Sequence, residues 1–324
     1  MATVVEHVLS LLPNSWEAWH AAVQESTWGG VDGKSCVAGT PNQYQRQWEP
    51  DHWGCKNGTT AASGLWYIEG TQSWMARHYE VPVLLSLAYL IVIFGLQAIM
   101  RNFQPFSLRP VLVLWNFLLA SFSLLGSYYT VPAIVSFANG PAAGDWKVDT
   151  CTVITEAANP WVFFFIVSKI PELLDTVFLA LRKRPIMFLH WYHHIATMLY
   201  CWDAWSLLVP AGGPFAAMNL VVHTIMYTYY CVMALHIRVP SFLASVITAL
   251  QTIQMLGGIY ILTTALQTCP TSQFSSDSRV RLNYYLGLLM YASYAFLFLK
   301  FFVDRYFIGR RRSQPAISNI KKTA

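Results

Sequence analysis

The most informative shortage in this 324-residue sequence is charge. Only 11% of its residues are Asp, Glu, Lys or Arg, whereas 55% are hydrophobic and 15% are aromatic. Soluble domains carry about 25% charged residues. The composition therefore excludes an ordinary soluble domain and predicts an all-α integral membrane protein.

Nucleic-acid and nucleotide-binding features are also missing. The sequence has no basic patch interleaved with aromatic residues, no zinc-ligand spacing and no glycine-rich phosphate loop. Its net charge of +5 is modest and is carried mainly by loops and chain ends. We therefore expect no nucleic-acid partner.

Long apolar runs are what the sequence has in abundance. A membrane-crossing helix needs about 20 mostly apolar residues, and seven stretches are of that kind. They predict seven transmembrane helices at about 81–100, 111–134, 159–181, 186–203, 214–235, 242–266 and 282–303. We expect residues 80–304 to form one transmembrane domain.

The distribution of Lys and Arg predicts the orientation. Most of these residues lie in the links after the first, third and fifth stretches and in the tail of residues 305–324. By the positive-inside rule, that tail is cytosolic and residues 1–79 form a lumenal extension. The sequon Asn57-Gly58-Thr59 suits a lumenal side, although a cytosolic tail with an accidental sequon is the alternative.

Six cysteines are present, and four of them fall on the predicted lumenal side. An oxidising compartment permits disulfides. We predict a disulfide between Cys151 and Cys269, and a second candidate pair is Cys36 with Cys55, although connectivity cannot be derived from sequence alone.

The apolar stretches contain ionisable side chains, which are costly in lipid and therefore suggest function. His190, His193 and His194 share one face of the fourth stretch, because positions i, i+3 and i+4 of a helix are neighbours. In the third stretch, Lys169 and Glu172 can pair. Asp175 lies nearby, and Pro171 should kink the helix.

Two further stretches have polar faces. A stripe in the fifth stretch contains Asn219, His223 and Tyr230, with Tyr227 at its edge, and Gln251 and Gln254 share a face of the sixth. These groups fit the wall of an active site. The alternative is that they hold helices together by hydrogen bonds.

The histidines allow two chemistries. The pattern His-x-x-His-His is similar to the histidine boxes of membrane di-iron oxidases, but only four of the nine histidines lie in the stretches and no second box is present. A single zinc ion remains compatible with the number of ligands. Alternatively, an imidazole is a covalent nucleophile, and a dry helical interior would protect an acyl-imidazole from water.

Four ordered motifs match those of the ELO family of very-long-chain fatty acid elongases. The sequence closely resembles this family over about residues 80–305, although it has Leu173 where the family often has Phe. The motifs are Lys169-x-x-Glu172-x-x-Asp175-Thr176, Leu189-His190-x-x-His193-His194, Asn219-x-x-x-His223-x-x-Met226-Tyr227-x-Tyr229-Tyr230 and Thr248-x-x-Gln251-x-x-Gln254.

The resemblance implies seven transmembrane helices, six of which form a barrel around a central acyl tunnel. It also implies a 3-ketoacyl-CoA synthase of the endoplasmic reticulum that uses acyl-CoA and malonyl-CoA and has no cofactor. His193 would take the acyl group, and His223 with Asn219 would promote decarboxylation of malonyl-CoA. His190 and His194 would tune the nucleophile.

Substrate contacts are implied at further positions. They are Lys169, Glu172, Asp175, Tyr227, Tyr230, Gln251 and Gln254. Arg182 and Lys183 lie at the expected cytosolic mouth, where they could bind CoA phosphates; the alternative is that they only set the orientation of the chain in the membrane. The box His-Trp-Tyr-His-His resembles the branch acting on saturated and monounsaturated chains. A polyunsaturated-chain elongase is the alternative. A metal-dependent membrane oxidase and a non-enzymatic receptor or transporter are the other competing hypotheses.

Location and partners follow from the same resemblance. The end Lys321-Lys322-Thr323-Ala324 resembles a dilysine retrieval signal, which would keep the protein in the endoplasmic reticulum. Expected partners are long-chain acyl-CoA, malonyl-CoA, membrane lipid and the other enzymes of the elongation cycle. A homodimer is a further candidate assembly.

Overall fold

A computed structural model describes residues 66–138, 159–209, 211–268 and 278–308. The sequon, all four cysteines assigned to the lumenal side and the dilysine end lie outside these ranges. The predicted disulfide between Cys151 and Cys269 is therefore not tested. The domain boundaries at residues 79 and 304 also stay predictions.

The regular structure of the described residues is entirely helical, which agrees with the all-α prediction. The longer helices are α3 (Trp66–Arg77), α4 (Glu80–Ile99), α5 (Arg109–Ala138), α6 (Asn159–Glu172), α7 (Leu174–Leu181), α8 (Phe188–Ser206), α9 (Gly212–Ala234), α10 (Phe242–Thr268) and α12 (Ser278–Val303). Two short turns, η4 (Met100–Asn102) and η5 (Asp304–Ile308), extend α4 and α12.

Five of these helices are long and apolar enough to cross a membrane, namely α4, α5, α9, α10 and α12. The other two predicted spans fall short of that standard for physical reasons. The third is divided between α6 and α7, with 14 and 8 residues. The fourth, α8, carries three histidines and Asp203, which lower its hydropathy. Seven crossings therefore remain a prediction.

The division between α6 and α7 confirms the predicted kink. Pro171 has no N–H to donate to the carbonyl of residue 167, so the helical ladder is interrupted. Around Leu173, hydrogen bonds instead join residues three apart. The Leu173 N–H donates to Ile170 O at 3.2 Å, and the Thr176 N–H donates to Leu173 O at 3.3 Å.

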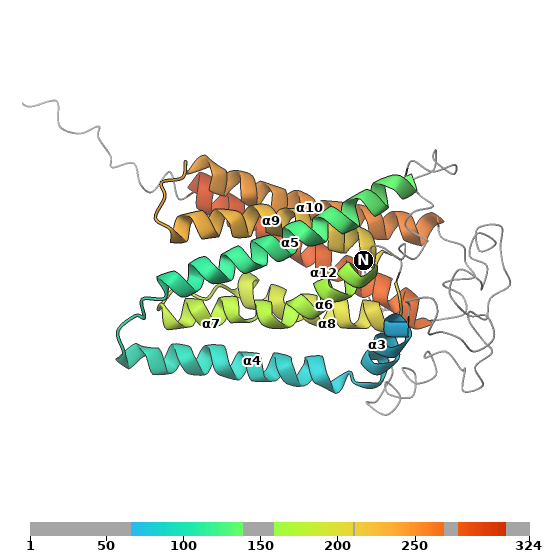
Figure 1. Cartoon of the computed structure of the whole chain (residues 1–324), viewed down its shortest axis with the longest axis horizontal. Helices are drawn as coiled ribbons and strands as arrows, with labels where there is room; N and C mark the ends of the chain where they lie inside the picture. The colour runs from blue at the N-terminus through green and yellow to red at the C-terminus, as the bar shows by residue number, and fades with distance from the viewer. Residues whose placement is uncertain (1–65, 139–158, 210, 269–277, 309–324) are drawn as a thin grey trace, which may run out of the picture.

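Six helices pack as a circuit, and α3, α4 and α7 lie outside it. Figure 1 shows the long helices side by side, with α4 along one edge of the bundle. Contacts run from α5 to α9, α10, α12, α8 and α6, and α6 returns to α5. Helix α4 packs against α7 and α8. Such a circuit fits the expected six-helix barrel, whereas a continuous acyl tunnel along it stays a prediction.

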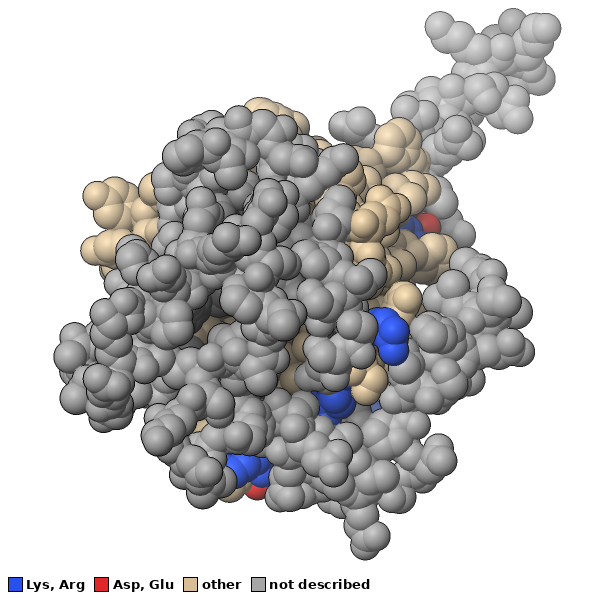
Figure 2. Space-filling view, turned by 90° about the vertical axis from the view of Figure 1, so that its right-hand side faces the viewer, with Lys and Arg blue, Asp and Glu red and all other residues tan. Residues whose placement is uncertain are grey.

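Helix α3 covers one end of α8. Gln72 Nε2 donates to Ser206 O at 2.6 Å, and Trp202 Nε1 donates to Met75 O at 2.8 Å. Met75 is buried with Trp202 and Trp205 in one apolar cluster. The visible described surface at this end is mainly uncharged, with a few scattered Lys or Arg side chains (Figure 2).

A buried ionic network lies beside α3. Asp203 of α8 accepts bonds from Arg279 NH2 at 2.8 Å, Asn283 Nδ2 at 2.7 Å and the Tyr79 hydroxyl at 2.8 Å. The Tyr79 hydroxyl also bonds to Ser206. Burial, and next the nearby Asp203 carboxylate, raise the pKa of Tyr79, so its hydroxyl remains a donor. The network joins α8, α12 and the start of α4.

Candidate active site

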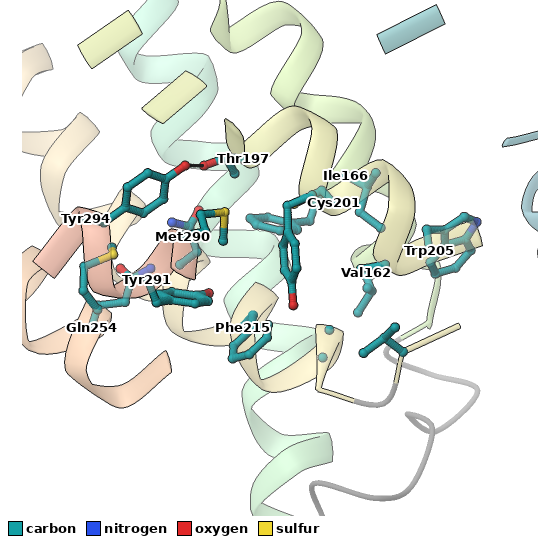
Figure 3. Close-up of a pocket in the computed structure, with 18 of the residues that line it drawn as sticks. Val162, Ile166, Thr197, Cys201, Trp205, Phe215, Gln254, Met290, Tyr291 and Tyr294 are labelled. Atoms are coloured by element: carbon teal, nitrogen blue, oxygen red, sulfur yellow. Dashed lines mark hydrogen bonds between the residues drawn. The ribbon is translucent and has the colours of Figure 1, made fainter. Parts of the chain in front are cut away.

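A cavity lies among α6, α8, α9, α10 and α12 (Figure 3). The space between its atoms, open solvent included, amounts to about 840 Å³. Most of its lining is apolar or aromatic, including Phe165, Ile166, Phe215, Met255 and Met290. The cavity suits a long apolar ligand that meets a few polar groups.

His193 is the histidine of the box that lines this cavity. Its ring centroid is 4.9 Å from that of Tyr294 and 5.7 Å from that of His194. The rings of His190 and His194 meet edge-on, with centroids 4.7 Å apart, as expected for positions i and i+4. The helix therefore turns His193 to the cavity and keeps the other two imidazoles behind it.

Helix α9 brings Asn219 to the same cavity. Asn219 and His223 are both buried, one helical turn apart. The His223 ring packs edge-on against Tyr227, with centroids 5.3 Å apart. The structure thus places the predicted amide at the cavity that contains His193, with the second predicted histidine next to it along α9.

The predicted ion pair of α6 is present. Lys169 Nζ lies 2.7 and 2.9 Å from the two carboxylate oxygens of Glu172, and their side chains are only 4% and 5% exposed. Ser168 donates to the same carboxylate at 2.9 Å, and Lys169 Nζ reaches Asn219 Oδ1 at 3.4 Å. These extra bonds matter because Coulomb attraction alone seldom offsets the desolvation of two buried charges.

Asp175 does not share the wall formed by Lys169 and Glu172. Its two carboxylate oxygens accept bonds from Trp115 Nε1 at 2.6 Å and from the Tyr227 hydroxyl at 2.9 Å. At about 100° per residue, Asp175 lies about 120° around the helix axis from Lys169, so its carboxylate faces α5 and α9. In this arrangement Asp175 holds the tyrosine that packs against His223.

The two tyrosines at the end of the α9 stripe differ in exposure, and the predicted substrate contact of Tyr230 stays a prediction. Tyr227 is buried, whereas the Tyr230 side chain is 46% exposed and does not line the cavity. Angular position gives the direction of a side chain, but burial also requires a neighbouring helix to cover it. Near the C-terminal end of α9, neighbouring helices cover Tyr227 and leave Tyr230 exposed.

Of the predicted substrate contacts, Gln254 lines the cavity, whereas the others lie outside its lining, namely Lys169, Glu172, Asp175, Tyr227, Tyr230, Gln251, Arg182 and Lys183. Gln251 Nε2 donates to the sulfur of Met226 at 3.2 Å. Arg182 and Lys183 follow the end of α7, and Lys183 Nζ donates to the carbonyls of Arg101 and Phe103 at 3.4 and 3.2 Å. Lys183 thus ties the α7 end to the turn after α4.

Several residues of the site carry no sequence motif. Tyr294 of α12, Tyr89 of α4 and Trp115 of α5 contact His193, His194 and Asp175 respectively. Aromatic residues in apolar helices resemble ordinary packing residues. The available signal was weak: a buried Tyr hydroxyl or Trp N–H usually needs a partner.

The alternative metal site has no ligand cluster in the ranges that the structure covers. Among those residues, no group of three or more His, Cys, Asp or Glu side chains is arranged to hold a metal ion.

The fold and the site define a helical membrane protein with a polar centre inside its bundle, next to an apolar cavity. The chain belongs to the ELO family, because residues 74–314 match the family model described as GNS1/SUR4 family. This result confirms the resemblance derived from the four motifs.

Relatives with assigned names are similar along most of their length. The chain is 39% identical over 238 residues to long chain fatty acid elongase 1 of Caenorhabditis elegans, covering 72% of this chain and 81% of that protein. It is 36% identical over 266 residues to fatty acid elongase 3 of Trypanosoma cruzi, covering 74% and 88%. It is 36% identical over 237 residues to very long chain fatty acid elongase 6 of Drosophila melanogaster, covering 73% and 75%.

Proposed function

We propose that this protein is the condensing enzyme of fatty acid elongation, a 3-oxoacyl-CoA synthase. Its reaction joins acyl-CoA and malonyl-CoA to give 3-ketoacyl-CoA, CO2 and CoA. Membership of a family of fatty acid elongases supports the role in elongation. The observation that carries the proposal is that His193 lines an apolar cavity together with Asn219.

In the first half of the reaction, a ring nitrogen of His193 attacks the thioester carbonyl. The C–N bond forms, the C–S bond breaks, and CoA leaves as a thiolate that takes up a proton. The apolar lining around His193 excludes water, which protects the acyl-imidazole from hydrolysis. His190 and His194, which pack edge-on against each other, with His194 edge-on against His193, tune and orient the nucleophile.

In the second half, malonyl-CoA loses CO2, and the electron pair left on its C2 attacks the acyl carbonyl. The C–C bond forms as the C–N bond to His193 breaks, and the imidazole, which lost its N–H proton when the CoA thiolate left, takes up a proton and becomes neutral His193 again. Lys169 donates to Asn219 Oδ1, so the amide can turn its N–H groups toward the thioester oxygen that becomes negative. His223 lies one turn along α9 and assists decarboxylation.

The remaining polar residues support these steps. Glu172 holds Lys169, Asp175 holds Tyr227 beside His223, and Gln254 offers an amide to the substrate. No cofactor is needed beyond the two CoA substrates. Arg182, with other basic residues at that end of the bundle, meets CoA phosphates.

We further propose long-chain saturated and monounsaturated acyl-CoA as the substrate class. The box His190-Trp191-Tyr192-His193-His194 supports this choice through its resemblance to that branch. Competition among acyl-CoA substrates of equal length with zero, one or several double bonds tests it. A preference for the polyunsaturated chain would contradict it.

We place the protein in the endoplasmic reticulum membrane with its C-terminus cytosolic and its N-terminus lumenal. Hydrogen bonds that join the basic segments after α4, α7 and α9 at one end of the bundle support this orientation. Lys183 donates to the carbonyl of Arg101, and Arg109 donates to the carbonyls of Ala234 and Leu235. Other enzymes of the elongation cycle and a homodimer are proposed partners.

Intact-mass analysis tests the covalent step directly. Purified protein incubated with stearoyl-CoA alone should gain one acyl group, and malonyl-CoA added afterwards should remove it as 3-ketoacyl-CoA. The variant His193→Ala should lose both the adduct and elongation. Retention of elongation in His193→Ala would exclude the acyl-imidazole.

A further inference from the structure

We propose that Tyr294 of α12 is a positioning residue for His193, so that α12 contributes to the active site although none of the four motifs lies on it. This inference rests on the proposed function, because it assumes that His193 accepts the acyl group. Tyr294 is only 1% exposed and lines the cavity with His193.

The hydroxyl of Tyr294 ties α12 to one turn of α8. It donates to the backbone carbonyl of His193 at 3.1 Å. It also shares a hydrogen bond with the Thr197 hydroxyl at 3.0 Å, which Figure 3 shows. One arrangement satisfies both contacts: Thr197 donates to Tyr294, and Tyr294 donates to His193. The tie therefore falls on the helical turn that carries the nucleophile.

The ring of Tyr294 also limits the His193 side chain. The two ring centroids are 4.9 Å apart at an interplanar angle of 45°, and Phe298, one turn further along α12, lies 6.4 Å from His193 at 89°. These two aromatic rings oppose rotation of the imidazole. Attack on a carbonyl needs reacting atoms about 3–3.5 Å apart and aligned, and a misplacement of about 1 Å can slow a reaction about 100-fold.

A neighbouring pair of residues provides a matched comparison. The hydroxyls of Tyr192 and Ser293 also join α8 to α12, at 2.9 Å. Tyr192→Phe and Tyr294→Phe each remove one hydroxyl between the same two helices and keep the ring. If hydroxyl ties serve only packing, both changes should have similar effects.

The variant Tyr294→Phe should fold. Without its partner, the Thr197 hydroxyl can bond to the carbonyl four residues earlier, which is that of His193, a contact that Thr residues often make in helices. No buried hydroxyl is then left without an acceptor, and thermal unfolding in detergent should stay near that of the wild type.

The test is the time course of acyl-adduct formation with stearoyl-CoA alone, followed by intact mass. For Tyr294→Phe we expect the maximal rate to fall about tenfold, with the half-saturating concentration of stearoyl-CoA within about twofold of wild type. For Tyr192→Phe, we expect both values within about twofold of wild type. This separation of rate from affinity is not expected from a general loss of stability.

The outcomes are distinct. Adduct formation in Tyr294→Phe as fast as in wild type, or an equal slowing in Tyr192→Phe, overturns the positioning role alone. Absence of any adduct in the wild type overturns the proposed covalent step itself, and the role of Tyr294 falls with it.

Discussion

Glycine has a steric role where α10 approaches α12. A Cβ atom added to Gly258 would lie 2.5 Å from Cδ1 and Cε1 of Tyr291, closer than non-bonded atoms tolerate. Tyr291 is buried and lines the cavity. The absence of a side chain at residue 258 therefore sets the position of a ring in the cavity wall.

Gly258→Ala should destabilise the protein by about 1–3 kcal/mol, the usual range for overpacking a core, because the ring of Tyr291 must shift. Thermal unfolding in detergent measures the change. Gly95→Ala is the control, since no atom lies within 4 Å of the added Cβ and Ala favours a helix more than Gly does. Equal stability of Gly258→Ala and wild type would show that the Tyr291 ring can shift without a cost in stability.

Helices α7, α8 and α9 share one way of ending. Each is followed by a non-glycine residue with positive φ, namely Lys183 at 54°, Leu208 at 48° and His236 at 62°. After α9, the N–H of His236 bonds to Met233 O and that of Ile237 bonds to Val232 O. This pattern is the Schellman motif, in which glycine is usual.

His236→Gly should therefore stabilise the protein by about 0.5–1 kcal/mol. The left-handed conformation costs an ordinary residue about 1–2 kcal/mol. The larger conformational entropy of glycine in the unfolded chain offsets part of this gain. The measurement is the midpoint of thermal unfolding in detergent. Leu235→Gly is the control: its φ is −73°, so glycine should lower the midpoint there. A fall with His236→Gly would mean that the imidazole makes a stabilising contact.

At the scale of the whole molecule, the Asp203 network joins parts that are distant in sequence. Asp203 of α8 meets Arg279 of α12 and Tyr79 before α4, and the Arg279 and Asp203 side chains are 6% and 15% exposed. Breaking a buried pair leaves a charge without its counterpart, which costs far more than losing a surface pair. The network thus stabilises the end of the bundle that α3 covers.

Asp203→Asn should lower stability by about 3 kcal/mol, whereas Lys300→Gln, which breaks the exposed pair with Asp304 at 61% and 50% exposure, should change it by less than about 0.5 kcal/mol. Unfolding of both variants in the same detergent provides the comparison. Similar small losses in the two variants would indicate that water reaches the Asp203 network.

Much of the site could be predicted from local sequence. The i, i+3 spacing of Lys169 and Glu172 predicted their ion pair, and Pro171 predicted the kink, since both depend on helix geometry alone. The roles of Asp175 and Tyr227 could not be predicted in the same way. Their contact crosses from α7 to α9, and no local pattern says which helix stands opposite Asp175.

The helical membrane class, the family and the polar residues of the motifs could be predicted from the residues alone, because apolar run length and spacing along a helix are properties of the chain. Three features required the packed helices: His193 lines the cavity, Tyr230 is exposed and Tyr294 contacts His193. These features depend on which helix stands opposite a given face. That relation links residues as far apart as 193 and 294, and no local pattern encodes it.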